Sequence, residues 1–111
     1  MRMNKAGRLR IYSDDSDKHA GKPVYQWLIE EAHRKGLRGA TATRGVMGFG
    51  NHDEIHSSKV FALSADMPVV VEVIDSREKL LAFVNDIDRA LENILATFDE
   101  VDIAIPGASG S

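Results

Sequence analysis

The stretch from Pro68 to Leu95 constrains the fold most, because it joins a strong strand signal directly to a strong helix signal. Val69 to Ile74 is almost continuously apolar and β-branched, which predicts a strand. Asp75-Ser76 follows at once, with Glu78 three residues after Asp75, a pattern close to the capping box that starts a helix. The apolar residues beyond it form one helical stripe over four turns: Leu80, Phe83, Val84, Ile87, Leu91, Ile94 and Leu95.

The first half of the chain repeats this order of strand and helix. Arg8 to Ser13 alternates, with Leu9 and Ile11 on one face, which is typical of a half-buried strand. A helix is expected from Pro23 at its first position to a cationic last turn at Lys35 and a C′ glycine at Gly36. The apolar positions of that helix are Val24, Trp27, Leu28 and Ala32.

Two further strands complete the pattern. Ala40 to Met47 is small and β-branched and follows a helix stop, and Val101 to Ile105 alternates. The order β-α-β, long loop, β-α-β predicts an α+β, ferredoxin-like domain with a four-stranded antiparallel sheet and two helices on one face. We expect a single domain over residues 1–111, with an ordered core over about 8–105 and a flexible tail at 106–111.

Such a plan leaves the second face of the sheet uncovered. Tyr12, Val70 and Ile74 are expected on that face, together with Arg10 and Glu72. This surface is too apolar to remain in contact with water, so we expect self-association with closed symmetry to bury it.

Composition and charge exclude several function classes. The 111 residues carry a net charge of -3, which argues against a dedicated nucleic-acid binder. Cysteine is absent, so disulfides, thiolate catalysis and sulfur-bound zinc are excluded. No apolar run reaches the roughly 20 residues of a membrane span, and Met1 to Arg10 lacks the apolar region of a signal peptide. A cytoplasmic protein is the expectation.

The segment from Arg44 to Ser57 combines glycine, arginine and histidine without apolar periodicity, which indicates a functional loop. Its glycines permit close backbone approach, and its arginine can donate two hydrogen bonds to a carboxylate or phosphate. Lys22 adds a cation beside the start of the first helix, where free N–H groups also favour anions. The candidate ligand-binding residues are Lys22, Arg44, Gly45, Gly48, Gly50, His52 and His56.

Motifs for specific chemistry are incomplete. Gly21-Lys22 is followed by Pro23 where a P-loop needs serine or threonine, and Gly48-Phe49-Gly50 lacks the third glycine of a dinucleotide fingerprint. His52 and His56 have the spacing of metal ligands on a helix, but Asp53 stands where a zincin has its glutamate. A metal site formed by His52, Asp53 and His56 is the weaker alternative, and no certain cofactor is expected.

The chain resembles domain-of-unknown-function family 190, whose members are relatives of the PII signalling proteins. The resemblance covers Leu9 to about Ile105 and rests on LRIY, SDKHAGKPVY, GATATRGVMGFG, IHSSK and MPVVVEVIDS. It implies a ferredoxin-like trimer with clefts between subunits that accept nucleotides or other small effectors. It also implies that residues 48–64 form a loop that engages a membrane transporter or an enzyme. The acidic segment Ala96 to Glu100 departs from the glycine- and lysine-bearing loop of PII proteins and cannot hold phosphates in the same way.

Three functional hypotheses follow. The leading one is a non-catalytic homotrimeric sensor that binds a small anionic effector, a nucleotide among the candidates, near Lys22 and Arg44. The second is a metal-dependent or hydrolytic enzyme that uses His52, Asp53 and His56. The third is a structural adaptor whose partner binding does not depend on any small molecule.

Overall fold

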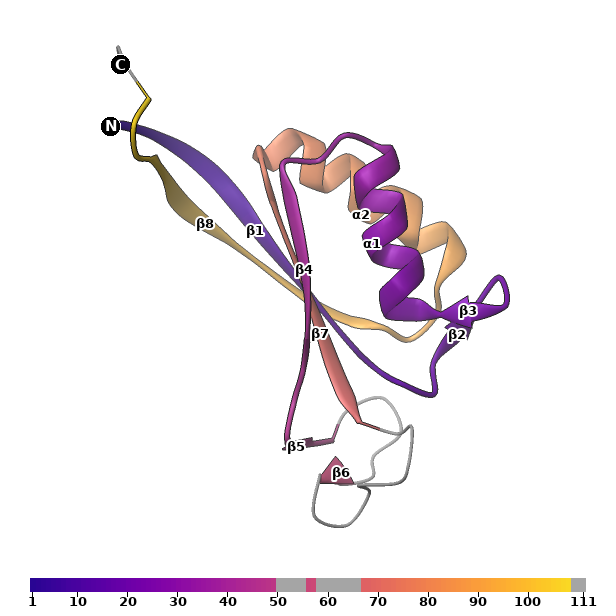
Figure 1. Ribbon diagram of the computed structural model, residues 1–111. Helices are drawn as coiled ribbons and strands as arrows, with labels where there is room; N and C mark the ends of the chain where they lie inside the picture. Colours follow the sequence, from indigo (N-terminus) through magenta and orange to yellow (C-terminus); the bar gives the residue numbers. More distant parts are fainter. Residues whose placement is uncertain (50–55, 58–66, 109–111) are drawn as a thin grey trace.

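The computed structural model describes residues 1–49, 56–57 and 67–108. Four long strands form one antiparallel sheet in the order β4-β7-β1-β8, and two helices cover one face of it (Figure 1). The fold prediction is therefore confirmed. The elements are β1 (Arg2–Asp14), β2 (Lys18–His19), β3 (Lys22–Pro23), α1 (Val24–Arg34), β4 (Gly39–Arg44), β5 (Met47–Gly48), β6 (His56–Ser57), β7 (Pro68–Asp75), α2 (Arg77–Ala90) and β8 (Leu95–Ile105).

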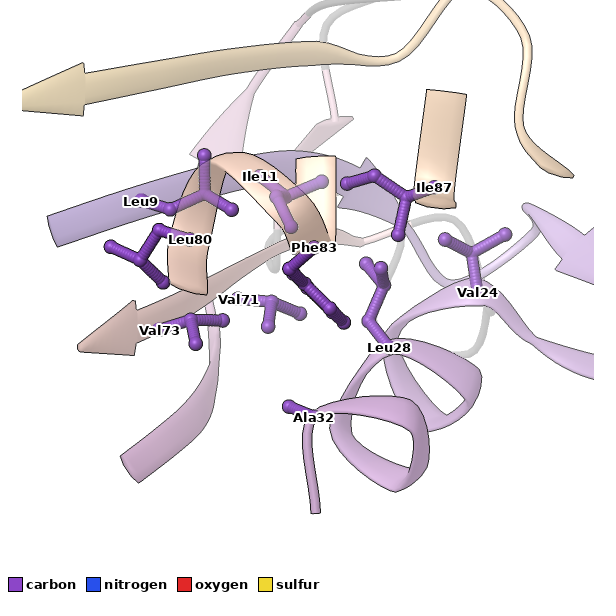
Figure 2. Close-up of a cluster of buried hydrophobic side chains, with 10 residues drawn as sticks. All are labelled: Leu9, Ile11, Val24, Leu28, Ala32, Val71, Val73, Leu80, Phe83 and Ile87. Atoms are coloured by element: carbon purple, nitrogen blue, oxygen red, sulfur yellow. The ribbon is translucent and has the colours of Figure 1, made fainter. Parts of the chain in front are cut away.

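The hydrophobic core lies between the helices and the sheet. Phe83 of α2 lies near its centre, between Leu28 of α1 and Val71 of β7 (Figure 2). The alternation in β1 and β7 directs every second side chain toward the helices, which is why strands with charged residues still contribute to the core. The buried cluster consists of Leu9, Ile11, Val24, Leu28, Ala32, Val71, Val73, Leu80, Phe83 and Ile87.

The helix starts and stops follow local signals. Ser76 caps α2, because its side-chain oxygen accepts a hydrogen bond from the Lys79 N–H at 3.3 Å. Pro23 is the N-cap of α1 and not its first residue, while Gly36 has a φ of 71°, as a C′ glycine requires.

The predicted end of the second helix is wrong. The helix stops at Ala90, where Leu91 takes an extended conformation, and Asn93 then adopts a φ of 55°. Leu91 and Ile94 still pack against the core from the connection, which is why the apolar spacing continues past the helix. Leu95 instead begins β8 and is 57% exposed.

The strand bounds also differ from the prediction. β1 runs from Arg2 and not from Arg8, and β4 ends at Arg44, since Met47 belongs to a separate short hairpin. The segment Ala96 to Glu100, expected as a loop, lies within β8, because its residues pair with β1. The connection before the last strand is 91–94 and contains neither glycine nor lysine.

The face of the sheet opposite the helices mixes ion pairs with apolar side chains. Register and alternation place Tyr12 beside Val70 on this face, with Leu95 on the other side of Tyr12. Two ion pairs lie further along β1: Arg10 with Glu72 at 3.1 Å, and Arg8 with Asp99 at 2.7 Å. Both helices lie on the other side, so neither covers this face (Figure 1).

Candidate functional site

A cavity of about 260 Å³ opens on the helix-free face, at the end of the sheet where β4 ends and β7 begins. Its walls are mainly apolar side chains and backbone. Phe49, which contributes to the wall, is 72% exposed. The residues that shape the cavity are Tyr12, Gly45, Gly48, Phe49, Pro68 and Leu95.

Two of the three predicted glycines, Gly45 and Gly48, line this cavity. The Gly45 N–H donates to the Pro68 carbonyl oxygen at 2.8 Å, which extends the β4–β7 ladder beyond the last residue of β4. A Cβ on Gly45 would lie 3.0 Å from Pro68 Cγ, whereas one on Gly48 would lie 3.5 Å from the same atom, an ordinary contact. A side chain at Gly45 would therefore have to push Pro68 aside by a few tenths of an ångström, whereas Gly48 has room for a small side chain.

Arg44 lies beside the glycines in the chain, but its guanidinium group is bound elsewhere. Pairing with Val69 places the Arg44 side chain on the helix side of the sheet. There Nε and Nη2 donate to the Asp15 carboxylate at 2.9 and 2.7 Å. This hydrogen-bonded carboxylate raises the pKa of Arg44 above its ordinary value, with a smaller contribution from Tyr25.

Lys22 is also paired within the chain. Its ammonium group donates to Glu30 Oε1 at 2.6 Å, which connects the β2–β3 hairpin to α1. The hydrogen bond from Lys22, followed by one from Gln26, lowers the pKa of Glu30. Both predicted cations thus have a carboxylate partner, and an added anion would have to compete with that partner.

The remaining predicted residues are described only in part. Gly50, His52 and Asp53 lie outside the described residues. His56 pairs through its backbone with Gly48 in the β5–β6 hairpin, but its side chain is not described. The metal alternative at His52, Asp53 and His56 therefore stays a prediction.

Sequence reasoning misses several residues of the site. The apolar spacing places Leu95 in a helix, and Asp15 carries no signal beyond that of a polar turn. The alternation that places Tyr12 and Val70 on the open face is the available signal for the cavity wall. No spacing signal connects Asp15 with Arg44, because the two residues are 29 positions apart and meet only in the folded chain.

Two negative findings apply to the described part of the chain. Among residues 1–49, 56–57 and 67–108, no three His, Cys, Asp or Glu side chains come together as a metal-binding group. Neither α1 nor α2, with 11 and 14 residues, has the length and hydropathy of a membrane-crossing helix.

Solved structures with the same fold are PII-like proteins. A putative PII-like signaling protein from Thermus thermophilus matches with a TM-score of 0.67 and 20% identity, over 93% of each chain. CPII, a nitrogen regulatory PII-like protein from Thiomonas intermedia bound to ADP, AMP and bicarbonate, matches with a TM-score of 0.64 and 15% identity, over 95% of this chain and 93% of that one. At these identities the likeness shows a PII-like fold.

Sequence relatives cover nearly the whole chain. A UPF0166 protein of Aquifex aeolicus is 40% identical over 103 residues, which is 93% of this chain and 97% of the relative. A UPF0166 protein of Methanocaldococcus jannaschii is 33% identical over 78 residues, which is 70% of this chain and 71% of the relative. The model of domain-of-unknown-function family 190, described as "Uncharacterized ACR", matches residues 6–103. The chain therefore belongs to this family, and its fold is that of PII-like signalling proteins.

Proposed function

We propose that this protein is a non-catalytic, PII-like homotrimeric sensor. A small anionic effector, with nucleotides as the first candidates, binds in a cleft between subunits at the base of the 48–64 loop. The bound state is read by a partner protein, a membrane transporter or an enzyme, through that loop. The observation that carries the proposal is the cavity on the helix-free sheet face, where the predicted glycines Gly45 and Gly48 meet.

The position of the cavity supports a site between copies. One side is built by β1, β7 and the start of β8, while Phe49 and Leu95 expose apolar side chains at its margin. A second copy packed on the helix-free face would cover these side chains and close the cavity. Apolar walls with a few polar groups are typical of small-molecule sites, and they suit the planar part of an effector.

Cations close to the same end of the sheet support an anionic effector. Arg44 ends β4 directly before Gly45, and β4 is an edge strand of the sheet. The Arg44 side chain lies on the helix side and does not line the cavity, but it is 56% exposed, so an effector in the cavity reaches it by extending around the β4 edge. Lys22 lies in the β2–β3 hairpin directly before α1. Tyr25, in the first turn of α1, contributes to the raised pKa of Arg44. A guanidinium group binds phosphate or carboxylate through two parallel hydrogen bonds.

The chemistry around the cavity supports binding without catalysis. The Ser13 hydroxyl donates to the Val69 carbonyl oxygen at 3.3 Å, so its proton is engaged in the sheet. No histidine of the described residues lines the cavity, and Asp14, the carboxylate in its lining, accepts hydrogen bonds from Ser16 and from the Asp17 N–H. CPII of Thiomonas intermedia, which shares the fold, is bound to ADP and AMP. This likeness makes adenine nucleotides the first ligands to test.

Calorimetric titration tests the proposal directly. ATP, ADP, AMP and cyclic dinucleotides are titrated into the wild-type protein, and at least one is expected to bind. Gly45→Val fills the cavity beside Pro68 and is expected to abolish that binding, whereas Gly39→Ala, a site with open space, leaves it unchanged. Absence of binding by every compound, or equal binding by Gly45→Val and wild type, would contradict the proposal.

A further inference from the structure

The anion-binding group of Arg44 is already occupied by a carboxylate of the same chain. The Asp15 side chain is only 10% exposed and receives both hydrogen bonds, while the Arg44 side chain is 56% exposed. Two of the five guanidinium N–H groups bind Asp15, and Tyr25 also acts on the guanidinium group. The largely buried Asp15 carboxylate thus holds Arg44 while more than half of the Arg44 side chain stays exposed to solvent.

Asp15 is fixed in place by a second contact. Its backbone N–H donates to the Met67 carbonyl oxygen at 2.9 Å, directly before β7. Asp15, which directly follows β1, therefore contacts both Arg44, the last residue of β4, and Met67, which precedes β7. The end of β4 and the start of β7 are also joined by the hydrogen bond from the Gly45 N–H to the Pro68 carbonyl oxygen. The Asp15 carboxylate is the part of this connection that an external anion can replace.

We propose that Asp15 is an internal ligand of Arg44 that an anionic effector must displace, and that this competition sets the affinity and the anion selectivity of the site. The inference rests on the proposed function, because it takes Arg44 as part of the effector site. A monocarboxylate offers Arg44 the same charge and geometry as Asp15, and it gains nothing by exchange. A phosphate group carries more charge and more acceptor oxygens, so phosphorylated effectors are favoured over simple carboxylates.

The loss of apparent anion affinity depends on the fraction of molecules in which Arg44 is not bound to Asp15. If the internal pair leaves about one tenth of Arg44 free, the apparent affinity for an anion falls about tenfold. Asp15→Asn removes the negative charge and keeps the backbone N–H that bonds Met67. Glu31→Gln is the matched control, because Arg34 donates to Glu31 from the same two nitrogens, at 3.0 and 2.7 Å, on the surface of α1.

The experiment compares wild type, Asp15→Asn and Glu31→Gln by calorimetry with inorganic phosphate, acetate and ADP. Asp15→Asn is expected to bind phosphate and ADP about tenfold more tightly than wild type, while Glu31→Gln matches wild type. A measurement on the wild type alone provides a test that does not depend on folding of the variant. Addition of ADP is expected to shift the carboxyl carbon resonance of Asp15 in the NMR spectrum as its two hydrogen bonds are lost.

The outcomes separate this inference from the proposed function. If wild type binds ADP, but Asp15→Asn binds it no more tightly and the Asp15 resonance does not move, the internal-ligand proposal is overturned and the sensor stands. If only Asp15→Asn binds phosphate and ADP, the internal ligand is supported and the nucleotide sensor is contradicted. If neither protein binds phosphate or ADP and the Asp15 resonance stays fixed, both proposals are overturned.

Discussion

Gly7 offers the sharpest test of how the helices pack on the sheet. It lies in β1 where α2 crosses, and a Cβ there would be 2.8 Å from Phe98 Cζ and 2.9 Å from Leu80 Cδ1. Real Cβ atoms do not approach carbon so closely, so Gly7→Ala must displace these side chains. Overpacking of this kind costs about 1 to 3 kcal/mol in the free energy of unfolding.

The backbone effect of alanine has the opposite sign and must be separated from the clash. Replacing glycine by alanine within a strand stabilises by about 0.5 to 1 kcal/mol when the space is open. Gly39→Ala in β4 is the control, because no atom lies within 4 Å of the added Cβ. We therefore expect the two variants to differ by about 2 kcal/mol, with Gly7→Ala the less stable.

Urea unfolding at a fixed protein concentration measures this difference, since association would otherwise change the apparent stability. With a slope of about 2 kcal/mol per molar, the midpoints of the two variants should lie about 1 M apart. Phe98→Leu in the Gly7→Ala background is expected to recover part of the loss by opening the space. Equal midpoints for Gly7→Ala and Gly39→Ala would refute the packing of Gly7 described above.

Three further predictions test the core, the ion pairs and the metal alternative. Phe83→Ala, at a side chain only 1% exposed, should lower the free energy of unfolding by about 3 to 5 kcal/mol, and a loss below about 1 kcal/mol in urea would contradict its central position. The hydrogen bond from Arg8 lowers the pKa of Asp99, so this contribution to stability is complete above the unfolded pKa near 4 and is lost as the pH falls through the folded pKa. Asp99→Asn should therefore be slightly less stable than wild type at pH 7, and this difference should shrink as the pH falls below about 4; a difference that widens toward low pH would show the opposite linkage. Elemental analysis of purified protein should find no stoichiometric metal if the sensor is right, whereas about one metal per chain that is lost in a His52→Ala, His56→Ala double variant would favour the enzyme.

The strands and helices were predictable where local pattern and tertiary packing agree. Leu9 and Ile11 alternate with charged residues because β1 has one buried face, and the run before Asp75 is β-branched because β7 lies in the middle of the sheet. The end of α2 was not predictable from periodicity. Asn93 turns the chain through a positive φ without a glycine signal, and Leu91 continues the apolar spacing from outside the helix.

The glycines predicted for a ligand site lie at the cavity, but ligand binding there stays a prediction, and the partners of the predicted cations were not foreseen. The cluster of glycines pointed to the end of β4, where Gly45 does pack against Pro68 at the cavity. Spacing could not show that Arg44 is bound to Asp15, because that contact depends on how β1 and β4 are brought together by β7. The same limit applies to Leu95, whose place at the cavity depends on its register with Tyr12.

Sedimentation velocity on the wild-type protein tests the central claim most directly, because a cleft between subunits requires the helix-free face to be covered by further copies of the chain. With a chain mass of 12.2 kDa, the account predicts one species of about 37 kDa at micromolar concentration. Tyr12→Glu together with Val70→Glu on that face should shift the species toward the monomer mass. A folded wild-type monomer throughout the concentration range would contradict the account, since the proposed cleft would then lack its second wall.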